Sequence, residues 1–247
     1  MITINIINLK TNDMKKTILT LLVSLLVVMV ANALDPKDLP VVDTLPERLV
    51  NGLKITPIRT TYRTGEIFWK LRVPNFDKSF QKFESKYPGV FSESESKETM
   101  DSIYNWREDV WNKIVSNEIK TAMGECERGK FKILLYINKE GEVFAVEFLM
   151  MNEEFQKLNT LPQNMMRDLY HNLLKEKCNA IKQCKFCYNP TVDHLERYGK
   201  DYIIMNMDWY IHDLFGTDNP TKLQEMLDDG RIGKIFEKRA AKDRKQK

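Results

Sequence analysis

The most constraining feature of this sequence is a pair of apolar runs, 131–137 and 143–149, on either side of a short polar segment. In the first run, one alternating row is Phe131, Ile133, Leu135 and Ile137, and the other is Lys132, Leu134 and Tyr136. A period of two places successive side chains on opposite faces of a strand. The polar segment ends at Gly141, and glycine readily adopts the positive φ of a tight hairpin turn. We therefore predict a β-hairpin over residues 131–149.

The remaining elements are expected around this hairpin. They are a hairpin at 60–73 around Thr64-Gly65, a short helix at 76–87, a long helix from a capping box at Ser92 and Glu95 to about 123, a helix at 161–177, a strand at 202–211 and a C-terminal helix capped by Asn219-Pro220. Residues 34–60, rich in Pro and turn signals, are expected to form an extended or loosely docked leader. The predicted fold class is α+β: a small antiparallel sheet packed by two helices, with an N-terminal strand and helix extension and a C-terminal helix.

Composition supports a folded chain. Of its 247 residues, 43% are apolar and 30% are charged, and the net charge is only +3. These values exclude a disordered polymer, a collagen-like repeat and a strongly basic nucleic-acid domain, so we expect no nucleic-acid partner. The expected regions are a signal peptide (1–33), an N-terminal extension (34–90), an α+β core domain (91–218) and a C-terminal helix with a basic tail (219–247).

The N-terminus has the pattern of a secretory signal peptide. A basic start at Met14-Lys15-Lys16 precedes residues 17–30, of which eleven of fourteen are Ile, Leu, Val or Met, and Ala31-Asn32-Ala33 follows. Signal peptidase requires small residues at the two alanine positions, so cleavage is expected after Ala33. We interpret residues 1–13 as preceding the true start. An uncleaved anchor and a buried helix are the alternatives, although fourteen residues fall short of the roughly 20 that span a bilayer.

Export changes how the four cysteines are interpreted. Cys126, Cys178, Cys184 and Cys187 are an even set, and outside the cytoplasm such a set favours disulfides. Zinc binding and C-x-x-C redox chemistry are the alternatives. We favour Cys126–Cys178 with Cys184–Cys187 among the three possible pairings.

Catalytic motifs are sparse. The sequence contains no phosphate-binding glycine loop, no G-x-S-x-G and no H-E-x-x-H. The weak candidates are Asp193, His194 and Glu196, since a carboxylate beside a histidine holds its tautomer and raises its pKa. We expect no cofactor and no resident metal.

The C-terminus is strongly basic. Residues 231–247 contain eight basic and two acidic residues, a net charge of +6. Removal of residues 1–33 takes away three lysines and one aspartate and lowers the total from +3 to +1, so residues 34–230 carry about −5. The basic residues are Arg231, Lys234, Lys238, Arg239, Lys242, Arg244, Lys245 and Lys247. They are candidates for weak contact with an anionic surface, and a docked helix with a solvated end is the alternative.

The order helix, hairpin, helix, strand over residues 98–211 resembles the C-terminal domain of TonB. The resemblance rests on the hairpin of residues 130–143 and the helix that follows it. Leu174-Lys175-Glu176-Lys177-Cys178 replaces that family's basic and aromatic run, and its Pro-rich linker is missing, so the resemblance implies a fold and not energy transduction. The whole chain also resembles small uncharacterised exported proteins of Bacteroides-type bacteria.

Two functional hypotheses follow. The favoured one is an exported, non-enzymatic module, periplasmic or extracellular, that binds a protein or peptide of the cell envelope by adding a strand to a free sheet edge. The alternative is an envelope hydrolase or metal-dependent enzyme built on Asp193, His194 and Glu196.

The export prediction is tested by expression in a Gram-negative bacterium. The protein should be recovered from the periplasm with Leu34 as its first residue, because the signal peptidase pocket accepts Ala31 and Ala33. N-terminal sequencing measures this, and an Ala31→Leu/Ala33→Leu variant should keep its N-terminal segment. An uncleaved wild-type chain would contradict the prediction.

Overall fold

The computed structural model of the protein describes residues 39–84, 87–92, 94–126, 130–187, 198–217 and 219–245. The predicted signal peptide therefore lies outside the described residues. The described residues fall into two units, 39–41 with 61–65 and the described part of 42–60 with 66–245, and the second carries the fold.

The strands are β1 (Val41–Thr44), β2 (Arg48–Val50), β3 (Leu53–Thr61), β4 (Ile67–Arg72), β5 (Tyr87–Phe91), β6 (Lys132–Asn138), β7 (Val143–Met151), β8 (Phe186–Cys187) and β9 (Tyr198–Asp208). The α-helices are α2 (Lys97–Ile114), α3 (Asn117–Gly124), α4 (Asn152–Lys157), α5 (Met165–Leu173), α6 (Trp209–Phe215), α7 (Pro220–Asp228) and α8 (Arg231–Lys245). Short 3-10 helices are η2 (Phe76–Phe80), η3 (Leu158–Thr160) and η4 (Asn179–Gln183).

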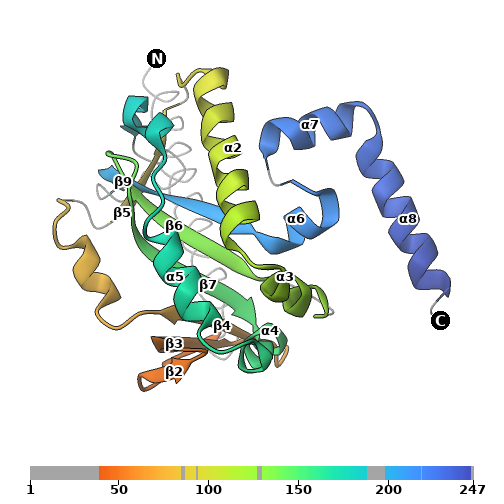
Figure 1. Ribbon diagram of the computed structural model, residues 1–247, viewed down its shortest axis with the longest axis horizontal. Coiled ribbons are helices and arrows are strands. Elements are labelled where there is room, and N and C mark those ends of the chain that lie inside the picture. The colour runs from red at the N-terminus through yellow and green to blue at the C-terminus, as the bar shows by residue number, and fades with distance from the viewer. Residues whose placement is uncertain are drawn as a thin grey trace, which may run out of the picture. The chain divides into compact units, whose positions relative to one another are not determined.

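The described strands form one curled mixed sheet in the order β1-β3-β4-β7-β6-β9-β5-β8, with β2 paired to β3 (Figure 1). The α+β class is confirmed, and so is the central hairpin: β6 pairs antiparallel with β7, and Gly141 has φ of 76°. The expectation of a small antiparallel sheet is wrong in the size of the sheet and in one strand pair. β5 runs parallel to β9, and strands from the N-terminal extension enlarge the sheet.

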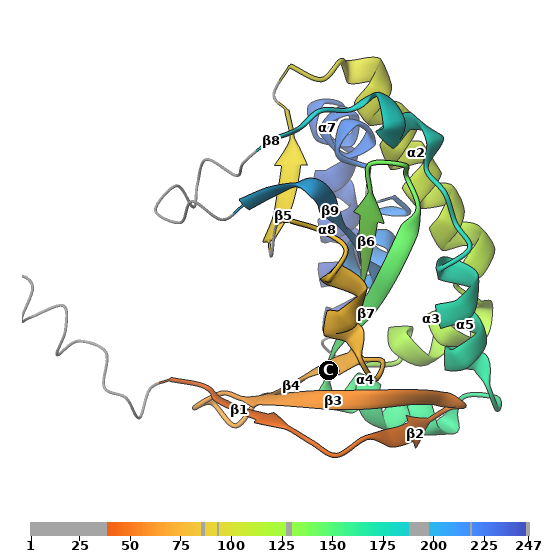
Figure 2. The same cartoon turned by 90° about the vertical axis from the view of Figure 1, so that its left-hand side faces the viewer.

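The alternation of β6 sends its two rows of side chains to opposite faces of the sheet. Ile133, Leu135 and Ile137 are buried in the main core, together with residues of α2, α3 and α5. Leu134 and Tyr136 belong to a second, mainly aromatic cluster. Figure 2 shows α2, α3 and α5 on one side of β6 and β7, and the gold segment that contains η2 on the other.

The expected loose leader at 34–60 is also wrong where it is described. Val50, Leu53 and Ile55 are buried in the main core. The turn between β2 and β3 is held by Asn51, whose Nδ2 donates to Pro162 O at 2.9 Å and whose Oδ1 accepts from Met166 N at 2.9 Å. Paired strands and this bridge fix residues 48–55 against the chain that leads into α5.

Helix boundaries differ from expectation because other caps take precedence. Ser96, not Ser92, caps α2 by accepting from Thr99 N, and Ser116 caps α3 after a break at Val115. Within the segment expected to be a helix at 76–87, residues 76–80 form the 3-10 helix η2 and Tyr87 begins β5, and α5 is shorter than the helix expected at 161–177. Asn219 caps α7 as expected, with Pro220 in its first turn.

No helix in the described part of the chain combines the length and apolar character needed to cross a membrane.

A buried carboxylate anchors the main core. Glu154 of α4 accepts three backbone N–H groups: Lys130 N at 2.7 Å, Phe131 N at 2.8 Å and Met151 N at 2.8 Å. It thereby joins the start of β6 to the end of β7. Glu154 is fully buried, so water cannot take over from the carboxylate as the acceptor for these N–H groups.

Glu154→Ala is expected to lower the free energy of unfolding by about 3 kcal/mol, because it leaves buried N–H groups unpaired. Gln156→Ala, at an exposed site on the same helix, is the matched control and should change it by less than about 0.5 kcal/mol. Urea unfolding measures both, and equal losses in the two variants would contradict the anchoring role of Glu154.

Candidate functional site

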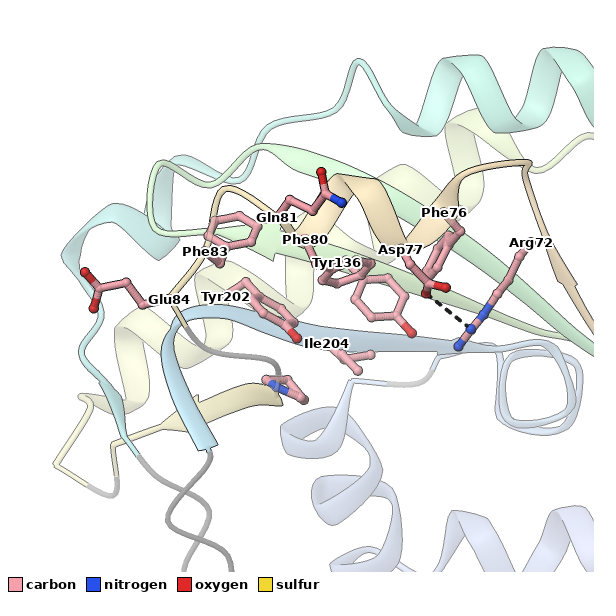
Figure 3. A pocket seen from close by; sticks show the side chains of 11 residues that line it. Arg72, Phe76, Asp77, Phe80, Gln81, Phe83, Glu84, Tyr136, Tyr202 and Ile204 are labelled. Atoms are coloured by element: carbon pink, nitrogen blue, oxygen red, sulfur yellow. Dashed lines mark ion pairs between the residues drawn. The ribbon is translucent and has the colours of Figure 1, made fainter.

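The sheet face opposite the main core carries a cavity of about 580 Å³, which we name the aromatic cleft (Figure 3). Its lining residues are Arg72, Phe76, Asp77, Phe80, Gln81, Phe83, Glu84, Pro88, Tyr136, Tyr202 and Ile204. This volume lies within the range of ligand-binding cavities, roughly 300–1,000 Å³.

The register of β6 and β9 determines which side chains form the floor of the cleft. Tyr136 of β6 lies directly opposite Ile204 of β9, and Tyr202 is two residues away on the same face. The chain turns after β4 at Asn75, whose φ is 62°, and η2 then brings Phe76 and Phe80 over the two tyrosines.

The aromatic rings form a packed wall. The ring centroid of Phe80 lies 5.2 Å from that of Tyr136 and 5.3 Å from that of Tyr202, both edge to face. Phe83 lies 5.2 Å from Tyr202, while Ile204 remains 38% exposed. Edge-to-face packing holds the rings in fixed positions, and the cleft therefore offers a preformed apolar surface.

Beneath this surface lies a buried carboxylate, Glu147 of β7, which is only 1% exposed. Arg72 Nε donates to Glu147 Oε1, and Tyr136 Oη donates to Glu147 Oε2 at 3.1 Å. Lys70 Nζ lies 3.9 Å from the same carboxylate. Burial beside Glu147 raises the pKa of the Tyr136 hydroxyl well above its usual value, and burial raises the pKa of Tyr202 to about 12. Both hydroxyls are therefore protonated and uncharged at physiological pH.

The rim carries charges of both signs. Arg72 lies 3.7 Å from Asp77 and 4.7 Å above the ring of Phe76. Lys82 Nζ lies 5.1 Å from the centroids of both Phe83 and Phe144. The aromatic cleft thus combines an apolar interior with a nearly balanced rim, an arrangement suited to binding a neutral or zwitterionic group.

The expected disulfides are not formed. Cys126, Cys178 and Cys184 are free thiols, so neither the Cys126–Cys178 nor the Cys184–Cys187 pairing is present. Cys126 Sγ instead donates to Ala122 O at 3.6 Å, within the turn that ends α3, while Cys178 and Cys184 flank η4. Burial raises the pKa of both the Cys126 and Cys184 thiols to about 11, which keeps them protonated.

The catalytic candidates Asp193, His194 and Glu196 lie outside the described residues. Within the described ranges, no three His, Cys, Asp or Glu side chains are grouped as a metal site. The sequence does not reveal the aromatic cleft, because the spacing of Phe76, Phe80 and Phe83 is also that of one face of the helix expected at 76–87. The available signal was the second alternating row of β6, which puts Tyr136 on the face away from the core.

The fold and this cleft define an α+β protein with a curled mixed sheet, one face of which is left partly open by its helices. No protein-family model matches the chain, and no curated protein matches it either. A solved structure that is similar is that of a DUF5043 family protein from Bacteroides uniformis ATCC 8492. The two are 11% identical with a TM-score of 0.36, over 67% of this chain and 84% of the other. A likeness this distant transfers no family, activity or partner to this chain.

The buried charge network predicts a stability effect. Arg72→Met removes the main partner of Glu147 and is expected to lower the free energy of unfolding by about 3 kcal/mol, because a buried carboxylate loses its compensating charge. The double variant Arg72→Met/Glu147→Met should lower the free energy of unfolding by less than Arg72→Met does, since no buried charge remains.

The matched control is Arg231→Met, which removes an exposed ion pair with Asp229 and should cost less than about 1 kcal/mol. Urea unfolding of Arg72→Met, Glu147→Met and the double variant provides the coupling energy of the two charges. If the double variant lowers the free energy of unfolding by the sum of the two single effects, the two charges are not coupled.

Proposed function

We propose that this protein is an exported, non-enzymatic binding module that captures an extended peptide segment by taking its apolar side chains into the aromatic cleft. The observation that carries this proposal is the preformed cavity of about 580 Å³, walled by aromatic rings that fix one another. A cavity of this size has room for a few side chains and not for a folded partner.

The charge distribution favours a peptide over a polyanion. Arg72 and Lys82 at the rim are balanced by Asp77 and Glu84, and Glu147 lies beneath the floor. A nucleic-acid or polyphosphate site needs a clear excess of positive charge. Peptide groups carry no net charge, and their apolar side chains gain from leaving water for the aromatic wall.

Strand addition is a second route by which the same partner could bind. β1 lies at one end of the sheet order, and its Val42 is 61% exposed. Exposed edge strands accept extended peptides through backbone hydrogen bonds, and the TonB-like resemblance supports this route. The cleft is favoured because it also provides pockets for side chains.

The proposal is tested with a random peptide display library panned against the protein. Peptides with aromatic or large aliphatic side chains should be enriched. Ile204→Glu places a carboxylate against the aromatic cleft and should weaken binding of the enriched peptides about tenfold or more, because burying that charge is unfavourable. Leu227→Glu is the matched control, an exposed apolar position on α7 that does not line the cleft, and should bind as the wild type does.

A Val42→Pro variant separates the two routes. It removes one backbone donor from β1 and should leave peptide binding unchanged if the side chains enter the cleft. Loss of binding in Val42→Pro with retention in Ile204→Glu would overturn the cleft and assign capture to the sheet edge. Failure of the wild-type protein to enrich any apolar peptide would overturn both routes.

A further inference from the structure

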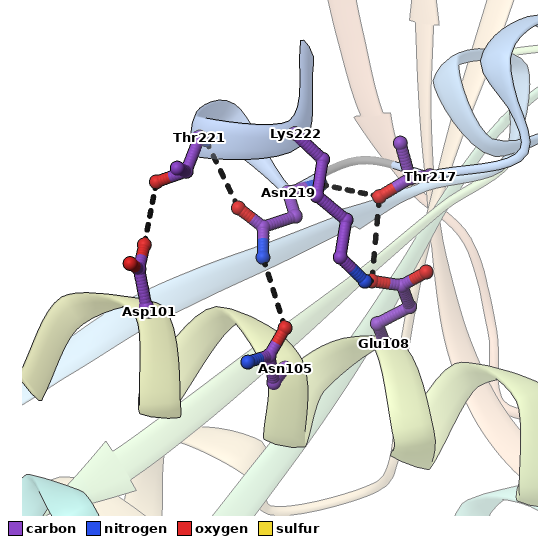
Figure 4. Close-up of polar contacts among 7 residues, drawn as sticks. All are labelled: Asp101, Asn105, Glu108, Thr217, Asn219, Thr221 and Lys222. Carbon is purple, nitrogen blue, oxygen red and sulfur yellow. Dashed lines mark hydrogen bonds and ion pairs between the residues drawn. The ribbon is translucent and has the colours of Figure 1, made fainter. Parts of the chain in front are cut away.

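The C-terminal helices form a part of the fold that is separate from the aromatic cleft. α7 is held on α2 by polar contacts (Figure 4). Thr221 Oγ1 donates to Asp101 Oδ1 at 2.5 Å, and Asn219 Nδ2 donates to Asn105 Oδ1 at 3.1 Å.

A third contact completes this set, which we name the polar clamp. Lys222 Nζ donates to Glu108 Oε2 at 2.6 Å, and Thr217 Oγ1 donates to the same oxygen at 3.3 Å. Asp101, Asn105 and Glu108 follow one another at i, i+4 and i+7, so they form a single polar row along α2. Directional bonds at both ends and the middle of this row fix the orientation of α7.

The orientation of α7 in turn sets that of α8. α8 starts at Arg231, directly after Gly230, whose φ of 75° makes the turn between the helices. The contacts of α8 are mainly with α7 and α6 (Figure 1), and the ring of Phe236 packs on Phe215 of α6 at 6.0 Å. The polar clamp therefore presents α8 in a defined direction.

α8 has two different faces. Ile232, Ile235 and Phe236 are spaced at i, i+3 and i+4 and form a short apolar stripe. Phe236 is 51% exposed despite its contact with Phe215, and Leu227 near the end of α7 is 57% exposed. Arg231, Lys234 and Lys238 are exposed beside the stripe.

Charge separates this helix from the rest of the chain. Residues 231–247 carry +6, whereas residues 34–230 carry about −5. An anionic surface therefore attracts α8 and repels the remainder, which favours an approach with the helix first. Basic side chains that flank exposed apolar ones are the pattern of helices that lie in a membrane interface.

We propose that α8 is an interfacial helix that docks the protein on an anionic phospholipid surface. Lys234 and Lys238 supply attraction to the headgroups, and Phe236 and Leu227 enter the interface between headgroups and acyl chains. The aromatic cleft takes no part in this contact, so the two activities are separable.

The test is flotation of the full chain with vesicles of phosphatidylcholine alone or with one quarter phosphatidylglycerol. Wild-type protein should bind the anionic vesicles at least about tenfold better, and the preference should fall in high salt. Lys234→Glu/Lys238→Glu should abolish the preference, and Phe236→Asn should weaken binding to anionic vesicles severalfold. All variants keep the N-terminal segment, so its own lipid binding sets a common baseline.

Lys175→Glu/Lys182→Glu is the matched control, since it reverses two exposed lysines elsewhere and changes net charge equally. It should retain the preference for anionic vesicles, and circular dichroism should show that all variants are folded. Equal binding to both vesicle types, or equal loss in the control, would overturn the proposal. So would binding of a DNA oligonucleotide in the absence of binding to anionic vesicles, which would assign α8 to a polyanion and not to a lipid surface.

Discussion

The open face of the sheet depends on one buried carboxylate. Glu147 is almost completely removed from water, and an isolated charge in that position would be strongly unfavourable. Arg72 and Tyr136 supply the compensating donors, so β4, β6 and β7 must present these three side chains on the same face. The Arg72 guanidinium then lies over Phe76, the first residue of η2. The ion pair beneath the floor thereby determines where the aromatic wall above it can pack.

The two faces of the sheet differ in what covers them. α2, α3 and α5 close one face with a continuous apolar core, and its buried side chains are closely packed. The other face is covered by η2 and the residues after it, whose rings pack against tyrosines that retain a polar end. A short 3-10 helix cannot shield a whole sheet face. The aromatic cleft is the part of that face which η2 leaves uncovered.

Local pattern predicted those elements whose neighbours are close in sequence. The hairpin of β6 and β7, the Asn219 cap of α7 and the α+β class all follow from alternation, capping chemistry and a glycine turn. The parallel pairing of β5 with β9 could not be predicted, because it joins strands more than a hundred residues apart through a register that no local signal encodes. The same holds for the aromatic cleft, since Arg72, Tyr136 and Tyr202 meet only when three separate strands are in register. The disulfide prediction was wrong for a related reason. An even number of cysteines favours disulfides, but it does not show which thiols lie close together in the fold.

The polar clamp attaches the C-terminal helices α7 and α8 to the fold with few additional buried apolar side chains. Met226 is the one buried side chain of α7, whereas Asp101, Asn105 and Glu108 hold it through directional bonds. Polar contacts of this kind contribute modestly to stability but fix orientation. The network around Glu147 shares no residue with the polar clamp, and contributions from sites without common partners are close to additive. The aromatic cleft and α8 can therefore vary independently, so a change in the charge of α8 alters how the protein meets a surface without altering what the cleft accepts.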